Sequence, residues 1–207
     1  MNPTRPSATE PCPAVILTGG RSTRMGSDKS SAALGGMTLL QRAVRTLGSV
    51  FDPVYISVRS LPGSVPRGCL PLPDVWPGRG PMSGLHAALS TVPSGAVFLC
   101  AVDLPFITAG AALMLLERSE GYDACVIRRE NGYLEPLFGV YSKACLPHIE
   151  ELITLGQYRM RSLLERCRVN YISENLVADP DTLLTNVNTP EELERARGMY
   201  EDIVSGP

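Results

Sequence analysis

The chain has 207 residues, of which 44% are hydrophobic and 19% charged, and 19 Lys and Arg against 21 Asp and Glu give a formal net charge of −2. This balance excludes the broad cationic surface typical of nucleic-acid-binding domains. No apolar run approaches the ~18 residues of a membrane helix, so we expect neither a nucleic-acid nor a membrane partner. The length suits one domain, expected over residues 13–207 after a polar, proline-rich, disordered tail at residues 1–12.

In the first half of the chain, buried strands alternate with helices. Short apolar runs rich in β-branched residues predict strands at residues 14–18, 54–58 and 96–102. Apolar residues at helical spacing predict helices around residues 39–47, 85–89 and 112–116. The region 60–80 contains many Pro and Gly residues, and we expect a long loop there. This alternation predicts an α/β fold with a mostly parallel sheet.

The second half departs from this order after about residue 127. A strand is expected at residues 124–127, and Asn131-Gly132 is a hairpin signal before an apolar run at 137–141, which predicts an antiparallel excursion. Helices are expected at about 142–155 and 159–167, followed by a strand at 168–173. Thr189-Pro190-Glu191-Glu192 forms a capping-box pattern that should open a helix running to about Val204.

The chain has few groups for acid–base chemistry. It contains two His, and only two of its 19 basic residues are Lys, Lys29 and Lys143. Its six Cys form no C-x-x-C pair, which argues against a zinc site and favours reduced thiols and a cytoplasmic location. The composition therefore favours electrostatic catalysis or binding.

A glycine-rich turn follows the first predicted strand. Residues 19–29 hold Gly19, Gly20 and Gly26 together with the cations Arg21, Arg24 and Lys29. Backbone N–H groups of such a turn, at the carboxyl end of a strand, can bind phosphate oxygens. The spacing matches neither the P-loop nor the G-x-G-x-x-G fingerprint. Asp103 directly follows the strand at 96–102, where one carboxylate together with substrate phosphates suits Mg²⁺.

Several blocks carry a family resemblance. The segment L-T-G-G-R-S-T-R-M-G-S-D-K at residues 17–29 resembles the signature loop of the molybdenum cofactor guanylyltransferases, with Thr18 in place of a small Ala. Further blocks that are similar to this family follow in order: P-D at 73–74, G-P-M-S-G-L at 80–85, V-D-L-P-F at 102–106, E-P-L-F-G-V-Y at 135–141 and N-V-N-T-P-E-E at 186–192. The resemblance covers about residues 13–200.

The resemblance implies a three-layer, Rossmann-like nucleotidyltransferase fold. It also implies transfer of GMP from GTP to molybdopterin with release of pyrophosphate, dependence on Mg²⁺, and partner proteins that deliver molybdopterin and mature molybdoenzymes. The implied catalytic residues are Arg24, Lys29 and Asp103, and the implied metal ligands are Asp103 and Asn188. The implied nucleotide-binding set is Leu17, Thr18, Gly19, Gly20, Lys29, Ser57, Asp74, Gly80, Gly84 and Asp103.

Some assignments stay open. Ser57 lies where the family often has Asn, so it could only substitute for that Asn in contacting the nucleotide. Asn188 directly precedes a helix cap, so a structural role in the turn competes with metal ligation. Arg159 or Arg161 could meet the pterin phosphate. Two other functions compete: a related nucleotidyltransferase that uses CTP on molybdopterin or acts on a sugar or alcohol phosphate, and a non-catalytic nucleotide-binding adaptor.

Overall fold

The computed structural model describes residues 12–18, 31–58, 65–76 and 78–206. The strands are β1 (Ala14–Leu17), β2 (Ala33–Leu34), β3 (Met37–Thr38), β4 (Val54–Val58), β5 (Leu70–Pro73), β6 (Ala96–Ala101), β7 (Ala124–Arg128), β8 (Leu134–Ser142) and β9 (Val169–Ser173). The α-helices are α1 (Leu39–Leu47), α2 (Pro81–Thr91), α3 (Ala109–Glu117), α4 (Leu146–Thr154), α5 (Met160–Leu164), α6 (Pro180–Leu183) and α7 (Pro190–Ser205). The described ranges also contain the 3₁₀ turns η2 (Lys143–Cys145) and η3 (Glu174–Leu176).

Seven of the strands form one sheet in the order β5-β4-β1-β6-β8-β7-β9. All neighbours are parallel except β8, which runs antiparallel to both β6 and β7. The carboxyl ends of six strands and the amino end of β8 therefore meet at one edge, which we call the carboxyl edge. The α/β class and the antiparallel excursion predicted from the sequence are confirmed.

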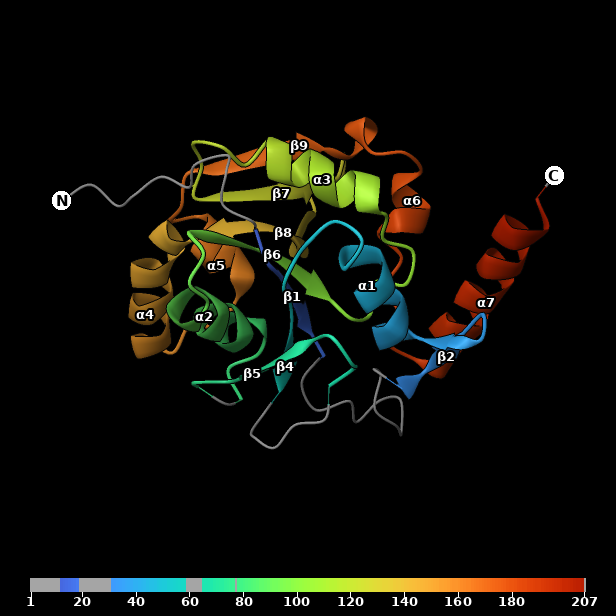
Figure 1. Cartoon of the computed structure of the whole chain (residues 1–207). Helices are drawn as coiled ribbons and strands as arrows, with labels where there is room; N and C mark the ends of the chain where they lie inside the picture. Colours follow the sequence, from blue (N-terminus) through green and yellow to red (C-terminus); the bar gives the residue numbers. More distant parts are fainter. Residues whose placement is uncertain (1–11, 19–30, 59–64, 77, 207) are drawn as a thin grey trace.

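Helices cover both faces of the sheet (Figure 1). On one face, Ala14 and Ile16 of β1 belong to a core that includes residues of α1, α3, α6 and α7. On the other face, Val15 and Leu17 belong to a core with α2, α4 and α5. The alternation along β1 is that of a strand buried on both sides, since all four of its residues are buried. The arrangement has the three layers that were predicted.

The expectation of a long loop over residues 60–80 is wrong for residues 70–73, which form β5. This strand pairs in parallel with β4, with Pro71 opposite Ile56 and Pro73 opposite Val58. Proline has no N–H to donate and is tolerated at a sheet edge, and β5 is the edge strand. Pro71 and Pro73, two of the prolines that predicted the loop, therefore belong to an edge strand.

Helix and strand ends differ from the predictions in smaller ways. The helix expected at 142–155 is divided into η2 and α4, and the one expected at 159–167 is the short α5. The capping box at Thr189 is confirmed, since its side chain accepts from Glu192 N–H and the Glu192 side chain accepts from the cap backbone. Cys100 and Cys125 are buried in β6 and β7.

The tail proposed for residues 1–12 lies outside the described residues except for Cys12, which is partly buried. Within the described ranges, no helix has both the length and the apolar character needed to span a membrane.

Candidate active site at the carboxyl edge of the sheet

The ends of β1, β4 and β5 are joined by a chain of polar contacts. The Thr18 hydroxyl donates to the Ser57 carbonyl oxygen over 2.8 Å, and the Ser57 hydroxyl donates to Asp74 Oδ1 over 3.2 Å. The backbone N–H of Asp74 donates to the Val58 carbonyl oxygen over 2.9 Å. Three residues expected at the nucleotide site, from three adjacent strands, are thus brought together.

Helix α2 begins at this cluster. Gly80 is its N-cap, with φ 66° and ψ −154°, and glycine has no side chain with which to cap the helix start. A positive φ of this kind favours glycine. The N–H groups of the first turn of a helix attract anions when no side chain caps them. Gly80 therefore leaves the backbone of this turn uncovered by any side chain at the cap position.

Gly84 lies where α2 packs closely against β1 and β4. A Cβ atom at Gly84 would come within 2.4 Å of Leu17 Cδ2 and 3.4 Å of Ser57 Oγ. The family resemblance includes Gly84 in the nucleotide-binding set. The structure gives it a packing role, which holds Leu17 and Ser57 in place beneath the helix.

Asp103 and Asn188 come together from distant parts of the chain. Asp103 follows β6, and its carbonyl oxygen accepts from the Val187 N–H over 2.9 Å. The next N–H, that of Asn188, donates to Glu192 Oε2 over 2.6 Å within the α7 cap. The backbone of Asn188 therefore has a structural turn role, and the neighbouring residue Val187 joins this turn to Asp103.

The remaining signature residues lie outside the described residues. These are Gly19, Gly20, Arg21, Arg24 and Lys29. Thr18, which directly precedes them, takes part in the polar contacts at the ends of β1 and β4.

Glu135 is a buried carboxylate that the sequence reasoning missed as a site residue. It lies near the amino end of β8, opposite Ile127 of β7, and is 6% exposed. Burial, with a smaller contribution from the nearby Asp103 charge, raises the pKa of Glu135 to about 7, and Arg129 opposes this rise. The available signal was a single acidic residue inside the otherwise apolar run L-E-P-L-F-G-V.

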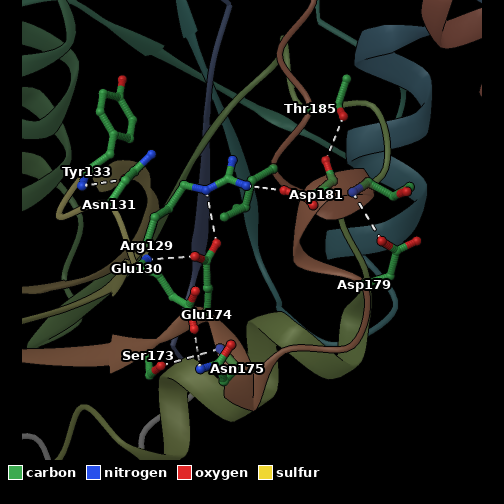
Figure 2. A network of polar contacts seen from close by, with 12 residues as sticks. Arg129, Glu130, Asn131, Tyr133, Ser173, Glu174, Asn175, Asp179, Asp181 and Thr185 are labelled. Carbon is green, nitrogen blue, oxygen red and sulfur yellow. Dashed lines mark hydrogen bonds and ion pairs between the residues drawn. The ribbon is translucent and has the colours of Figure 1, made fainter.

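Arg129, just past β7, anchors a polar network at the same edge (Figure 2). Its Nε donates to Glu174 Oε2 over 2.9 Å, and a second guanidinium nitrogen contacts Asp181. Glu174 Oε1 also accepts from the Glu130 N–H over 2.6 Å. In the strand order β6-β8-β7-β9, the edge thus presents Asp103, Glu135, Arg129 and Glu174 in turn.

The two arginines considered for a pterin phosphate lie at the start of α5. Arg161 is exposed and pairs with Glu165 within the helix, whereas Arg159 is exposed at its N-cap. The preceding Tyr158 lies under the guanidinium of Arg79, with 4.7 Å from the guanidinium carbon to the ring centroid, and accepts a hydrogen bond from it. The start of α5 is therefore joined to Arg79, the residue before the N-cap of α2.

The described protein groups at this edge fit a divalent cation only if the substrate supplies further ligands. No group of three His, Cys, Asp or Glu in the described ranges could hold a metal by itself. Mg²⁺ typically takes one or two protein carboxylates and completes its shell with phosphate oxygens and water. Asp103, at the end of a central strand, provides such a carboxylate.

Comparison with known proteins agrees with this geometry. Residues 14–171 match the family model described as MobA-like NTP transferase domain. A protein of Pelotomaculum thermopropionicum named probable molybdenum cofactor guanylyltransferase is 40% identical over 195 residues, covering 93% of this chain and 95% of that protein. The molybdenum cofactor guanylyltransferase of Desulfosudis oleivorans is 31% identical, with 90% and 95% covered.

A solved structure is similar as well. Molybdopterin-guanine dinucleotide biosynthesis protein A from Archaeoglobus fulgidus superposes with a TM-score of 0.77 at 26% identity, covering 90% of this chain and 97% of that one. A cytidylyltransferase from Thermus thermophilus, at 15% identity and a TM-score of 0.67, shares the fold. The sheet, the residues gathered at its carboxyl edge and these matches lead to one conclusion: the chain belongs to the family of MobA-like NTP transferase domains.

Proposed function

We propose that this protein transfers GMP from GTP to molybdopterin, giving the guanine dinucleotide cofactor and pyrophosphate. The observation that carries the proposal is the meeting, at one sheet edge, of the Thr18–Ser57–Asp74 chain with Asp103 and Asn188, in a chain 40% identical to a protein named for this activity. The two substrates are inferred from the names of the relatives, and we propose that both bind at the carboxyl edge.

The chemistry suits a chain with few acid–base groups. A terminal phosphate oxygen of molybdopterin attacks the α-phosphorus of GTP, the bond from that phosphorus to the bridging oxygen breaks, and pyrophosphate leaves. The nucleophile is already an anion, so the enzyme has to align the reactants and stabilise developing charge. Leu17, Thr18, Gly19 and Gly20 would bind the nucleotide, while Arg24 and Lys29 would hold the triphosphate.

Asp103 would hold Mg²⁺, with Asn188 as a second ligand. When bound, the cation would neutralise charge on the phosphate oxygens. Ser57 would fix the carboxylate of Asp74 through their hydrogen bond, and Asp74 would contact the nucleotide. Gly80 would leave the start of α2 accessible to it.

The acceptor would lie on the β8 side of Asp103. Arg159 would meet its phosphate there, since α5, of which Arg159 is the N-cap, contacts β8. Partner proteins that deliver molybdopterin or receive the product, and the cytoplasmic location, stay predictions from the sequence.

Product analysis tests the proposal. Purified protein with GTP, Mg²⁺ and molybdopterin should release pyrophosphate and form the guanine dinucleotide, whereas CTP should give little product. Asp103→Asn and Lys29→Ala should keep the fold and lose activity by a factor of ~100 or more, the usual effect of losing one charge-stabilising contact.

Two results would contradict it. Faster turnover of CTP than of GTP would assign the chain to the cytidylyl branch, and nucleotide binding without turnover would support the adaptor. Undiminished activity of Lys29→Ala would remove the role given to that lysine.

A further inference from the structure

Cys145 and Cys167 form a pair of thiols whose sulfur atoms lie 3.6 Å apart. All six cysteines of the chain lie within the described ranges and are free thiols, and among them only these two have their sulfur atoms in hydrogen-bond contact. Cys145 is buried, whereas Cys167 is partly exposed. One thiol of the pair can therefore meet a small solute directly, and the other can react through its neighbour.

Asp123, directly before β7, holds both cysteines in position. Its carbonyl oxygen accepts from the Cys145 thiol over 3.2 Å. Its carboxylate oxygen Oδ2 accepts over 2.8 Å from the backbone N–H of Arg168, the residue after Cys167. The two sulfur atoms thus face each other from backbone segments fixed to the same residue. A disulfide bond is ~2 Å long, so rotation of the two side chains would bring the sulfur atoms to bonding distance.

The pair lies at the edge of the sheet opposite to the carboxyl edge. Cys145 follows the carboxyl end of the antiparallel β8, and Cys167 precedes the amino end of β9. Helices α4 and α5 lie between the two cysteines in the chain and contact each other (Figure 1). A bond between the sulfur atoms would close this helix pair into a covalent loop away from the candidate active site.

The two thiols differ in reactivity. The contact with Cys145 lowers the pKa of Cys167, although burial and the Asp123 charge oppose this change, and the same contact together with burial raises the pKa of Cys145. The thiolate is the nucleophilic form of cysteine, and reactive cysteines are partly exposed. Cys167 is therefore the thiol that an oxidant would meet first.

We propose that Cys145 and Cys167 are an oxidation site that hydrogen peroxide converts reversibly to an intramolecular disulfide. The Cys167 sulfur attacks one peroxide oxygen, the O–O bond breaks, and a sulfenic acid and one water form. The Cys145 sulfur then attacks the Cys167 sulfur, the S–S bond forms, and the hydroxyl group leaves with the Cys145 proton as a second water. The two thiols lose two electrons, and the peroxide gains them.

Peptide mapping without reductant tests the bond directly. Trypsin cuts after Lys and Arg, so the oxidised protein should give one linked pair of tryptic peptides, 144–159 and 167–168. The unfolded oxidised protein should have two fewer reactive thiols than the reduced protein, and dithiothreitol should restore them. The thermal unfolding midpoint should rise on oxidation by roughly 5–10 °C, because closing a loop of this length removes conformational entropy from the unfolded chain.

Three variants locate the site. Cys167→Ser should lose both the linked peptides and the rise in midpoint. Cys145→Ala should do the same, and Cys167→Ser, at a partly exposed position, carries the test if the buried variant does not fold. Cys69→Ser is the matched control, because Cys69 is also partly exposed but makes no sulfur contact in the described ranges, and this variant should behave as the wild type.

Three outcomes would overturn the proposal. The first is an unchanged thiol count after a treatment that oxidises glutathione in the same solution. The second is a bond that joins Cys167 to another chain or to a different cysteine. The third is a midpoint that falls on oxidation, since the native contact then could not be bridged without strain. None of these assays uses a nucleotide, so their results are independent of the proposed function.

Discussion

Glu135 shows at the scale of one residue how a buried carboxylate affects stability. Its pKa is raised from 4.5 to about 7 by burial and by the Asp103 charge. Between these values the folded protein binds more protons than the unfolded chain, so the free energy of unfolding falls as pH rises from about 4.5 to 7. At about 1.4 kcal/mol per pKa unit, the loss is roughly 3 kcal/mol and is complete above that range.

Glu135→Gln should remove this pH dependence, because the amide has nearly the same shape and carries no charge. We expect the variant to be more stable than the wild type at pH 8 and similar to it below pH 4.5, measured by urea unfolding in the presence of a chelator. Glu201→Gln, at an exposed position of α7, is the control and should keep the wild-type slope. Equal slopes in all three proteins would contradict the assignment to Glu135.

At the scale of elements, the packing of α2 on the sheet decides the shape of the site. An alanine at Gly84 gains up to about 1 kcal/mol of helix propensity, but its Cβ would displace Leu17, whose Cδ2 would be 2.4 Å away. Overpacking of this kind costs ~1–3 kcal/mol. We therefore expect Gly84→Ala to lower both the urea midpoint and GTP affinity.

The matched control for this change is Gly110→Ala in the first turn of α3. A Cβ at Gly110 meets no atom within 4 Å, so only the gain in helix propensity remains and the midpoint should stay equal or rise. A Gly84→Ala variant that behaves like Gly110→Ala would show that Leu17 adjusts without cost, and the packing argument would fail.

Elements with a local signal could be predicted from the sequence, and those defined by distant partners could not. Strand β4 and helix α1 have the predicted bounds because their apolar periods are regular, and the Thr189 cap is a local pattern. Strand β5 was missed because its prolines suggest a loop until β4 is beside it. In the candidate site, Asp103 followed from its place after a strand. Arg129 did not, since its contacts come from residues after β9.

At the scale of the whole molecule, Arg129 links distant segments at the β7–β9 side of the carboxyl edge. Its contacts join the β7–β8 turn to residues 45 and 52 positions away, Glu174 after β9 and Asp181 in α6 (Figure 2). The Arg129 and Glu174 side chains are 23% and 11% exposed. The pair is thus largely withdrawn from water, and removing one partner leaves the other charge poorly solvated.

Arg129→Met should therefore lower the free energy of unfolding by about 2 kcal/mol, less than the ~3–5 kcal/mol of a fully buried pair. Because Arg129 also lowers the pKa of Glu135, the pH-dependent loss of stability should extend to higher pH in this variant. Adding Glu174→Gln should restore part of the stability, since the uncompensated charge is then gone. The control is Arg161→Met, whose pair with Glu165 is 78% and 63% exposed and is worth at most ~0.5 kcal/mol. Equal urea midpoints for the two arginine variants would mean that the Arg129 network does not stabilise this side of the carboxyl edge. A lower midpoint for Arg129→Met alone, partly recovered in the double variant, would establish that Arg129 holds β7, β9 and α6 together on the proposed acceptor side.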